Sequence, residues 1–197
     1  MLLELTAVAL AAIHFGIPPV YYYYLKARWL NKPWNIEVDS SYTPMISIIV
    51  PTYNEAGFIE EKLNNIYEQD YPRDRLEIIV VDSGSTDGTS EKVLEWSKKH
   101  SDITVKLIRE PVRRGKAHAL NEALKHVSGE VVVVTDADSK WLSRDTLRRV
   151  AIYMSNPGVG AVSCTKVPEA SGPGGIEVLY RDFYNAIRVA ESNIYST

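Results

Sequence analysis

The sequence has almost no cysteine, since Cys164 is the only one among 197 residues. An internal disulfide and a thiolate metal site are therefore both excluded. The formal net charge is only −3, so the chain lacks the basic excess that marks nucleic-acid-binding proteins. No GxGxxG follows a predicted strand, and neither GxxxxGKS nor GxxxxGKT occurs. These absences disfavour a dinucleotide-binding Rossmann site, a P-loop site and a nucleic-acid partner.

The amino-terminal stretch from Leu5 to Tyr24 carries no formal charge and is long enough to cross a ~30 Å hydrocarbon core as a helix. Aromatic and basic residues follow as they do at the cytoplasmic end of a membrane span: Tyr21 to Tyr24, Trp29 and Trp34, with Lys26, Arg28 and Lys32. His14 and the pair Pro18 and Pro19 argue against a span, which leaves a helix docked on a membrane surface or a partner as the alternative. We predict a hydrophobic anchor or docking helix over residues 1–30, with the globular part membrane-associated and facing the cytoplasm.

Residues 31–44 are polar and contain two prolines, which predicts a linker before a domain at 45–197. Short β-branched runs in that domain have the length of strands buried on both faces: Ile46–Val50, Leu76–Val81, Val105–Ile108, Val131–Val134 and Val159–Cys164. Amphipathic stretches between and after them predict helices: Glu55–Gln69, Thr89–Lys99, Lys116–Val127, Arg144–Met154 and residues 175–197. The alternation predicts an α/β fold with a mostly parallel sheet and flanking helices. Cys164 is expected to be a buried small hydrophobe.

The loop after the fourth predicted strand contains two carboxylates, Asp136 and Asp138. The period of two of an extended chain would aim both side chains in a similar direction. Loops at the carboxyl ends of parallel strands form the ligand crevice of such sheets. Carboxylates there suit Mg²⁺ or Mn²⁺, whose coordination is completed by substrate phosphates. Taken alone, such a motif is more often two aspartates that start a turn, because aspartate is common in turns. The motifs upstream favour the metal site.

Two earlier loops carry further polar and aromatic residues. Pro51 is expected to end the first strand, and Tyr53 after it presents a ring that can stack on a base. The segment Asp82–Thr89 is rich in glycine and opens a helix, whose free amides favour an anionic or hydrogen-bonding ligand. A plain capped turn is the alternative for this loop.

Four motifs together resemble the family 2 glycosyltransferases of the GT-A fold: PTYNE at 51–55, VVDSGSTDGT at 80–89, GKAHALNEAL at 115–124 and TDADS at 135–139. They occur in the order that this family shows, and the resemblance covers roughly residues 45–195. It implies an inverting hexosyltransferase that takes a sugar from a nucleotide sugar and uses Mg²⁺ or Mn²⁺. The acceptor would be lipid-linked or a polysaccharide. One departure is Ser83, where the family more often has a second aspartate.

The resemblance also implies which residues bind the nucleoside. Tyr53 would stack on the uracil of a UDP-sugar, with Pro51, Thr52 and Glu55 beside the nucleoside. Asp82 would accept a hydrogen bond from the edge of the base. UDP and GDP both remain open, because an aromatic ring stacks on any base.

The diphosphate and the metal would lie against the third and fourth motifs. By the same resemblance Lys116 lies near the nucleotide, Asp136 contacts ribose or metal, and Asp138 binds the metal. Lys116 could instead be an ordinary solvated lysine at a helix start. His118 is expected to cap or pack in the first turn of its helix.

A catalytic base is the missing part of the resemblance. Family members supply an acidic residue well downstream of the Asp-x-Asp strand, but here no downstream acid has a matching motif: Asp145, Glu169, Glu177, Asp182 and Glu191. We therefore expect a donor-binding half, completed by a partner chain or belonging to a longer protein. Two functions follow, a glycosyltransferase or a nucleotide-sugar-binding module without turnover of its own. A nucleotidyltransferase is a third alternative.

Overall fold

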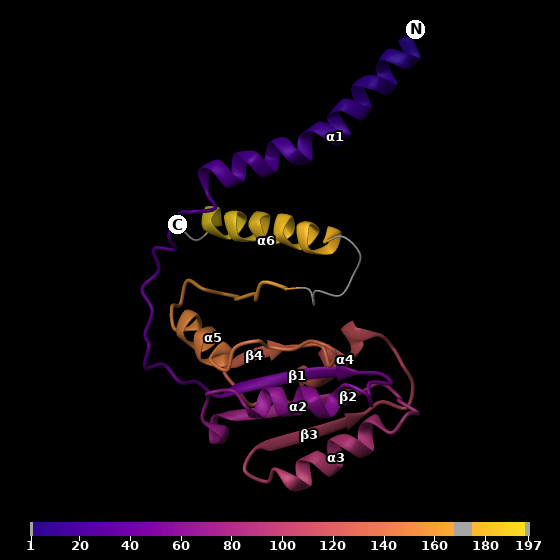
Figure 1. Ribbon diagram of the computed structural model, residues 1–197. Helices are drawn as coiled ribbons and strands as arrows, with labels where there is room; N and C mark the ends of the chain where they lie inside the picture. The colour runs from indigo at the N-terminus through magenta and orange to yellow at the C-terminus, as the bar shows by residue number, and fades with distance from the viewer. Residues whose placement is uncertain (1, 168–174, 196–197) are drawn as a thin grey trace. The chain divides into compact units, whose positions relative to one another are not determined.

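The computed structural model describes residues 2–167 and 175–195 (Figure 1). These residues form two compact units. One runs from Val38 to Gly160, and the other combines the segment up to Glu37 with the segment from Ala161 onward. The predicted division at residues 30 and 44 stays a prediction.

The unit from Val38 to Gly160 is built on a four-stranded sheet in the order β3-β2-β1-β4, with all pairs parallel. Its strands are β1 (Ile46–Thr52), β2 (Leu76–Asp82), β3 (Thr104–Arg109) and β4 (Val131–Val134). β1 and β2 lie at its centre and are almost wholly buried, as their β-branched runs predict. Thr52 pairs with Asp82, which pairs with Arg109, so the three strands end at one edge. The predicted α/β fold with a parallel sheet is confirmed.

Helices cover both faces of this sheet (Figure 1). They are α2 (Ile59–Tyr67), α3 (Thr89–Lys99), α4 (Lys116–Leu124) and α5 (Thr146–Met154), with a short 3₁₀ helix η1 (Arg73–Arg75) before β2. The larger core cluster packs α2, α3 and α5 against one face: Ile48, Val50, Ile59, Leu63, Ile78, Val93, Trp96, Leu147 and Ala151 are among its members. The smaller cluster packs α4 against the other face through Ala119 and Ala123, which meet Ile49, Ile79 and Val81. The alternation of strand residues between the two clusters is the period of two of an extended chain.

Some predicted elements are wrong. Val159–Cys164 is not a strand, and Cys164 is exposed instead of buried. In the described part of the chain β4 pairs only with β1, so this apolar run has no neighbouring strand to bond to. Leu94 and Leu124 are also exposed. Each follows a buried residue of its helix, and one residue turns a helix by about 100°, which carries the side chain away from the core.

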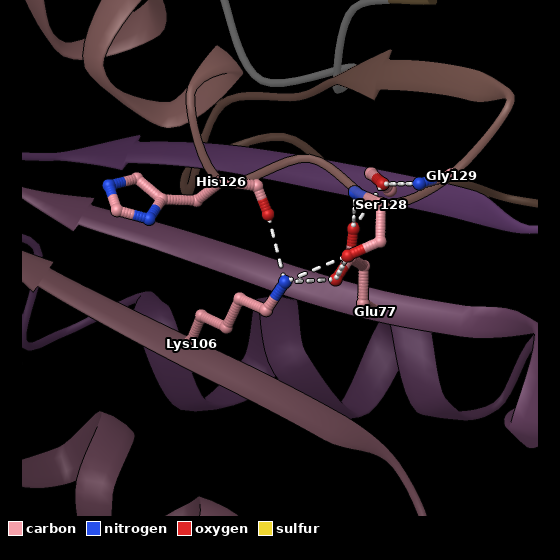
Figure 2. A network of polar contacts seen from close by, with 6 residues as sticks. Glu77, Lys106, His126, Ser128 and Gly129 are labelled. Carbon is pink, nitrogen blue, oxygen red and sulfur yellow. Dashed lines mark hydrogen bonds and ion pairs between the residues drawn. The ribbon is translucent and has the colours of Figure 1, made fainter.

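A polar network fixes the chain where the strands begin, at the opposite end of the sheet from the predicted crevice (Figure 2). The carboxylate of Glu77 on β2 is 1% exposed and pairs with the Lys106 ammonium at 2.7 Å. It accepts the Ser128 amide at 2.6 Å and the Ser47 hydroxyl, and Ser47 Oγ accepts the Gly129 amide at 2.8 Å. Burial opposes ionisation of Glu77, but the bonds from Lys106, Ser47 and Ser128 outweigh it and lower its pKa to about 2.

The other unit contains the two long helices α1 (Leu2–Arg28) and α6 (Ile176–Tyr195). The ring of Tyr22 stacks on that of Phe183 with centroids 4.7 Å apart, and the Tyr21 hydroxyl donates to Glu191 at 2.7 Å. Leu25 is buried there, as is Ala190. Tyr21 and Tyr22, predicted to sit at a membrane interface, therefore contact α6.

Helix α1 has the length and composition of a membrane span. Its most apolar 18-residue window has a mean hydropathy of 1.5, and none of that window is buried. Within the described ranges α1 is the one helix with this property. Pro18 and Pro19 lie inside it, and the helix is bent in Figure 1, as expected where a proline removes a backbone donor.

Candidate functional site

The end of β1 supplies the first group of predicted site residues. β1 continues through Pro51, which pairs with Val81, so the expectation that this proline ends the strand is wrong. Thr52 is buried, and its hydroxyl donates to the Val81 carbonyl at 3.2 Å. Tyr53 is the first exposed side chain after the strand, at 37% exposure. The structure thus places Thr52 as support for the loop and Tyr53 where a ligand can reach its ring.

The loops after β1 and β2 are bonded directly to each other. The Asn54 amide donates to Ser85 Oγ at 2.8 Å, and Asn54 Oδ1 accepts the Thr86 amide at 3.0 Å. The Glu55 amide donates to Thr89 Oγ1 at 2.9 Å. Asn54 adopts a left-handed φ of 55°, which asparagine tolerates better than most residues. These bonds make the two loops one rigid wall.

Asp82 organises the glycine-rich loop from within. Its side chain is buried, Oδ1 accepts the Ser85 amide at 3.0 Å, and Oδ2 accepts the Ser90 hydroxyl. Gly84 has a φ of +80°, a conformation that favours glycine. The contact between Asp82 and a nucleobase stays a prediction, while its bonds to the loop are present in the structure.

The loop between β3 and α4 brings basic residues to the same edge. The Arg113 guanidinium lies over the Tyr53 ring, 4.3 Å from its centroid. The Lys116 ammonium forms an ion pair with the Asp136 carboxylate. This pair joins the third and fourth motifs across 20 residues of sequence. The structure therefore brings Lys116 and Asp136 together, as a shared site requires.

A buried carboxylate that the sequence interpretation missed lies behind this loop. Glu110 follows β3 and is 7% exposed, accepting the Ser83 hydroxyl at 2.7 Å. His118 Nδ1 lies 2.5 Å from its other oxygen, so His118 pairs with Glu110 and does not simply cap its helix. Arg114 lies 3.4 Å from the other ring nitrogen of His118. The one signal in the sequence was Ser83, a hydroxyl where the family more often has an acid.

The Asp-x-Asp loop continues directly from β4. The Thr135 amide donates to the Ile49 carbonyl at 3.1 Å, and the chain then turns so that the Ser139 amide reaches the Asp136 carbonyl at 3.3 Å. Asp136 is half-buried and Asp138 is exposed. Both carboxylates are thus presented at the surface where β4 ends.

The electrostatics of this crevice favour a cation. Burial raises the pKa of Glu55, and so do the nearby carboxylates Asp138, Asp87 and Asp136. Four carboxylates, Glu55, Asp87, Asp136 and Asp138, are thus close enough to interact electrostatically, and only Asp136 of them is paired with Lys116. Within the described ranges no three His, Cys, Asp or Glu side chains form a complete metal-binding group. Such a donor set fits a hard divalent cation that takes its remaining ligands from substrate phosphates.

The downstream acids already have structural partners or stand exposed. Asp145 accepts from the Ser143 hydroxyl, Glu177 pairs with Arg181 at 3.5 Å, and Glu191 accepts from Tyr21. Asp182 is exposed. Glu169 lies outside the described residues. A base is therefore not assigned by these contacts.

A parallel sheet with these loops at its carboxyl edge defines an α/β domain of the GT-A class. Residues 47–191 match the model of Glycosyl transferase family 2, and the chain belongs to this family. The resemblance drawn from the four motifs is thereby confirmed.

Relatives of known name extend this finding. A mannosyltransferase from Pyrobaculum calidifontis, solved in complex with GDP-Man and Mn²⁺, is 55% identical, and the match covers 97% of this chain and 52% of that one with a TM-score of 0.85. The poly-beta-1,6-N-acetyl-D-glucosamine synthase of Staphylococcus epidermidis is 30% identical over 77% of this chain and 36% of its own length. A poly(ribitol-phosphate) beta-N-acetylglucosaminyltransferase of Staphylococcus aureus is 30% identical over 77% of this chain and 26% of its own. The chain spans about half of the first, somewhat more than a third of the second and about a quarter of the third.

Proposed function

We propose that this chain is the donor-binding part of a metal-dependent glycosyltransferase that uses a nucleoside diphosphate sugar. The observation that carries the proposal is the ion pair of Lys116 with Asp136. It joins the third and fourth motifs at the sheet edge where the loops of the first two are also bonded together. Four segments far apart in sequence thus meet at one end of the sheet, as a single ligand with a base, a ribose and a diphosphate would require.

The donor we propose to test first is GDP-mannose, in place of the UDP-sugar that the sequence suggested. The mannosyltransferase solved with GDP-Man is 55% identical across nearly the whole chain, whereas the N-acetylglucosamine-transferring relatives are 30% identical. The Tyr53 ring stacks on guanine as well as on uracil. Contacts to the base edge decide between them, and the wall formed by the first two loops contains three carboxylates, Glu55, Asp82 and Asp87.

Asp136 and Asp138 would hold Mg²⁺ or Mn²⁺ together with the diphosphate. Bound there, the cation would stabilise the charge that develops on the leaving nucleoside diphosphate. The chain's own residues share this task. Lys116 offers a positive charge at the same point, and Tyr53 with the loop from Asp82 to Thr89 orients the nucleoside. The ion pair keeps the Lys116 ammonium in place before the donor arrives.

Calorimetric titration with GDP and UDP, with and without Mn²⁺, tests this assignment. Wild-type protein is expected to bind one of them strongly only with the metal, because the diphosphate otherwise faces two carboxylates. Asp138→Ala should abolish the metal dependence, while Asp74→Ala at the opposite end of the sheet should leave it intact. Tyr53→Ala should cost about 1–3 kcal/mol of binding free energy, and Tyr53→Phe almost nothing. Metal-stimulated binding that survives in Asp138→Ala at wild-type strength would show that the metal site is elsewhere.

The acceptor and the membrane belong to the same proposal. We infer that α1 anchors the protein and that the acceptor is lipid-linked or a growing polysaccharide, because none of the most apolar 18-residue window of α1 is buried. A nucleotide-sugar-binding module without turnover is the second candidate, favoured by the lack of an assigned base. Carbonate extraction of membranes tests the anchor, and release of the full-length chain into the supernatant would contradict it.

A further inference from the structure

Helix α2 buries a lysine beneath the Asp-x-Asp loop. Lys62 is 1% exposed, although its neighbours on the same helix face are Ile59, Leu63 and Ile66. Its ammonium donates to the Ser139 carbonyl at 3.0 Å and lies 3.3 Å from the Ser139 hydroxyl. Ser139 is the last residue of the TDADS motif. The ammonium of a buried lysine thus binds the loop that carries both aspartates.

Two more polar side chains, Asn65 of α2 and Gln69 just beyond its end, continue this contact along the following segment. Asn65 donates to the Trp141 carbonyl at 2.9 Å and accepts the Trp141 amide at 2.8 Å. Gln69 donates to the Ser143 carbonyl at 3.1 Å. Residues three apart share a helix face, so Lys62 and Asn65 lie in one row, and Gln69 follows in the turn after the helix. We call these three residues the polar seam. The seam satisfies backbone groups of a segment that lies outside helices and strands.

The Asp-x-Asp loop is therefore fixed at both ends. At its start the Thr135 amide bonds to the Ile49 carbonyl of β1 at 3.1 Å. At its end Lys62 holds Ser139, whose hydroxyl lies 3.1 Å from Thr135 Oγ1 and so closes the loop on itself. Asp136, Ala137 and Asp138 lie between these two anchors. Their backbone cannot shift without breaking one of them.

Stability alone does not account for a lysine at this position. Burying an ammonium is costly, and replacing buried charged groups by apolar residues of similar volume is often neutral or stabilising. The hydrogen bonds to Ser139, together with the Trp141 ring 4.5 Å away, offset that cost but do not require a charge. The ammonium binds the carbonyl and the hydroxyl of one residue at the same time, and so holds Ser139 at two points.

We propose that Lys62 is a positioning residue that sets the geometry of the Asp136 and Asp138 carboxylates for cation binding. This inference rests on the function proposed above. It predicts that the loss of a positive charge lowers the affinity for a cation, the opposite of what electrostatics alone would give. Removing a positive charge near a cation site should strengthen cation binding by electrostatics alone, whereas losing a group that positions the ligands should weaken it.

The test measures Mn²⁺ binding in the presence of GDP or UDP, by the electron paramagnetic resonance signal of free Mn²⁺. Lys62→Met keeps the volume and the apolar stem but removes the ammonium, and we expect Mn²⁺ to bind about 10- to 100-fold more weakly, the range for outer partners of metal ligands. Lys62→Arg, which can still donate, should recover part of the loss. Lys140→Met is the matched control, since it removes the same charge from an exposed neighbour of Ser139 and should bind Mn²⁺ as tightly as wild type or more tightly.

Each outcome decides between the two proposals. If the wild type shows no nucleotide-dependent Mn²⁺ binding, the proposed function and the role of Lys62 both fail. If the wild type binds Mn²⁺ but folded Lys62→Met binds it equally or more tightly, the positioning role alone is overturned. Should Lys62→Met not fold, Ser139→Ala replaces it, because it removes one of the two acceptors of Lys62. It should weaken Mn²⁺ binding by about threefold, less than a full loss of the outer partner, and unchanged binding would overturn the role.

Discussion

Glu77 is a single carboxylate on which three segments of the chain converge. It joins β2 to β1 through Ser47, to β3 through Lys106, and to the loop before β4 through Ser128 (Figure 2). Its pKa is lowered from 4.5 to about 2, so the folded protein favours the ionised form. A group of this kind stabilises the fold above its unfolded pKa, and the stabilisation disappears as the pH falls toward the folded value.

We predict that Glu77→Gln lowers the free energy of unfolding at pH 7 by about 3–4 kcal/mol, because the pKa falls from 4.5 to about 2 and each tenfold change is worth about 1.4 kcal/mol. The loss should shrink as the pH falls below about 4.5, because Glu77 in the unfolded wild type then takes up a proton while the folded group, with a pKa of about 2, stays ionised. Urea unfolding at pH 7, 5 and 3.5 measures it. Glu95→Gln, whose exposed carboxylate pairs with Lys99, should cost no more than about 0.5 kcal/mol. A Glu77→Gln effect that is the same at every pH would contradict the ionic role.

At the scale of elements, β4 docks on β1 through a very close approach of backbones. A Cβ on Gly129 would lie 2.7 Å from the Met45 carbonyl oxygen and equally close to the Ser47 amide nitrogen. Gly129→Ala should therefore destabilise the protein by about 1–3 kcal/mol, the usual cost of overpacking. Gly57→Ala is the control, because nothing lies within 4 Å of its added Cβ. Thermal unfolding of both variants measures the difference, and equal melting temperatures would mean that the contact relaxes freely.

Elements with a strong local pattern were predictable, and elements that depend on a distant partner were not. α3 begins at Thr89 and ends at Lys99 as its apolar period predicts. Val159–Cys164 is an apolar run like those of the observed strands. It forms no strand, because a strand forms only where another strand offers hydrogen bonds. The site divides in the same way. Its motif residues stand at strand ends and could be read from the sequence, whereas Lys62 and Glu110 act through contacts 77 and 27 residues away.

At the scale of the whole molecule, we predict that the 197-residue chain binds its donor but transfers sugar slowly. No downstream acid is placed as a base by the described contacts, and general-base catalysis typically contributes about 10²–10⁴-fold. Release of nucleoside diphosphate, measured with and without a membrane extract that supplies acceptor and partner, tests this. Rapid acceptor-dependent turnover by the chain alone, lost in Asp182→Asn, would overturn the prediction and identify Asp182 as the base.

The strand order also determines how the molecule folds. β1 pairs with β2 in register from Ile46 with Leu76, but the same Ile46 pairs with Val131 on its other side. The second pairing closes a loop almost three times as long, and closure entropy together with the late synthesis of β4 delays it. We therefore expect the three strands β1, β2 and β3 to pair before β4 joins the sheet. The two aspartates follow β4 directly, so a partly folded chain presents the nucleoside wall without the metal-binding loop.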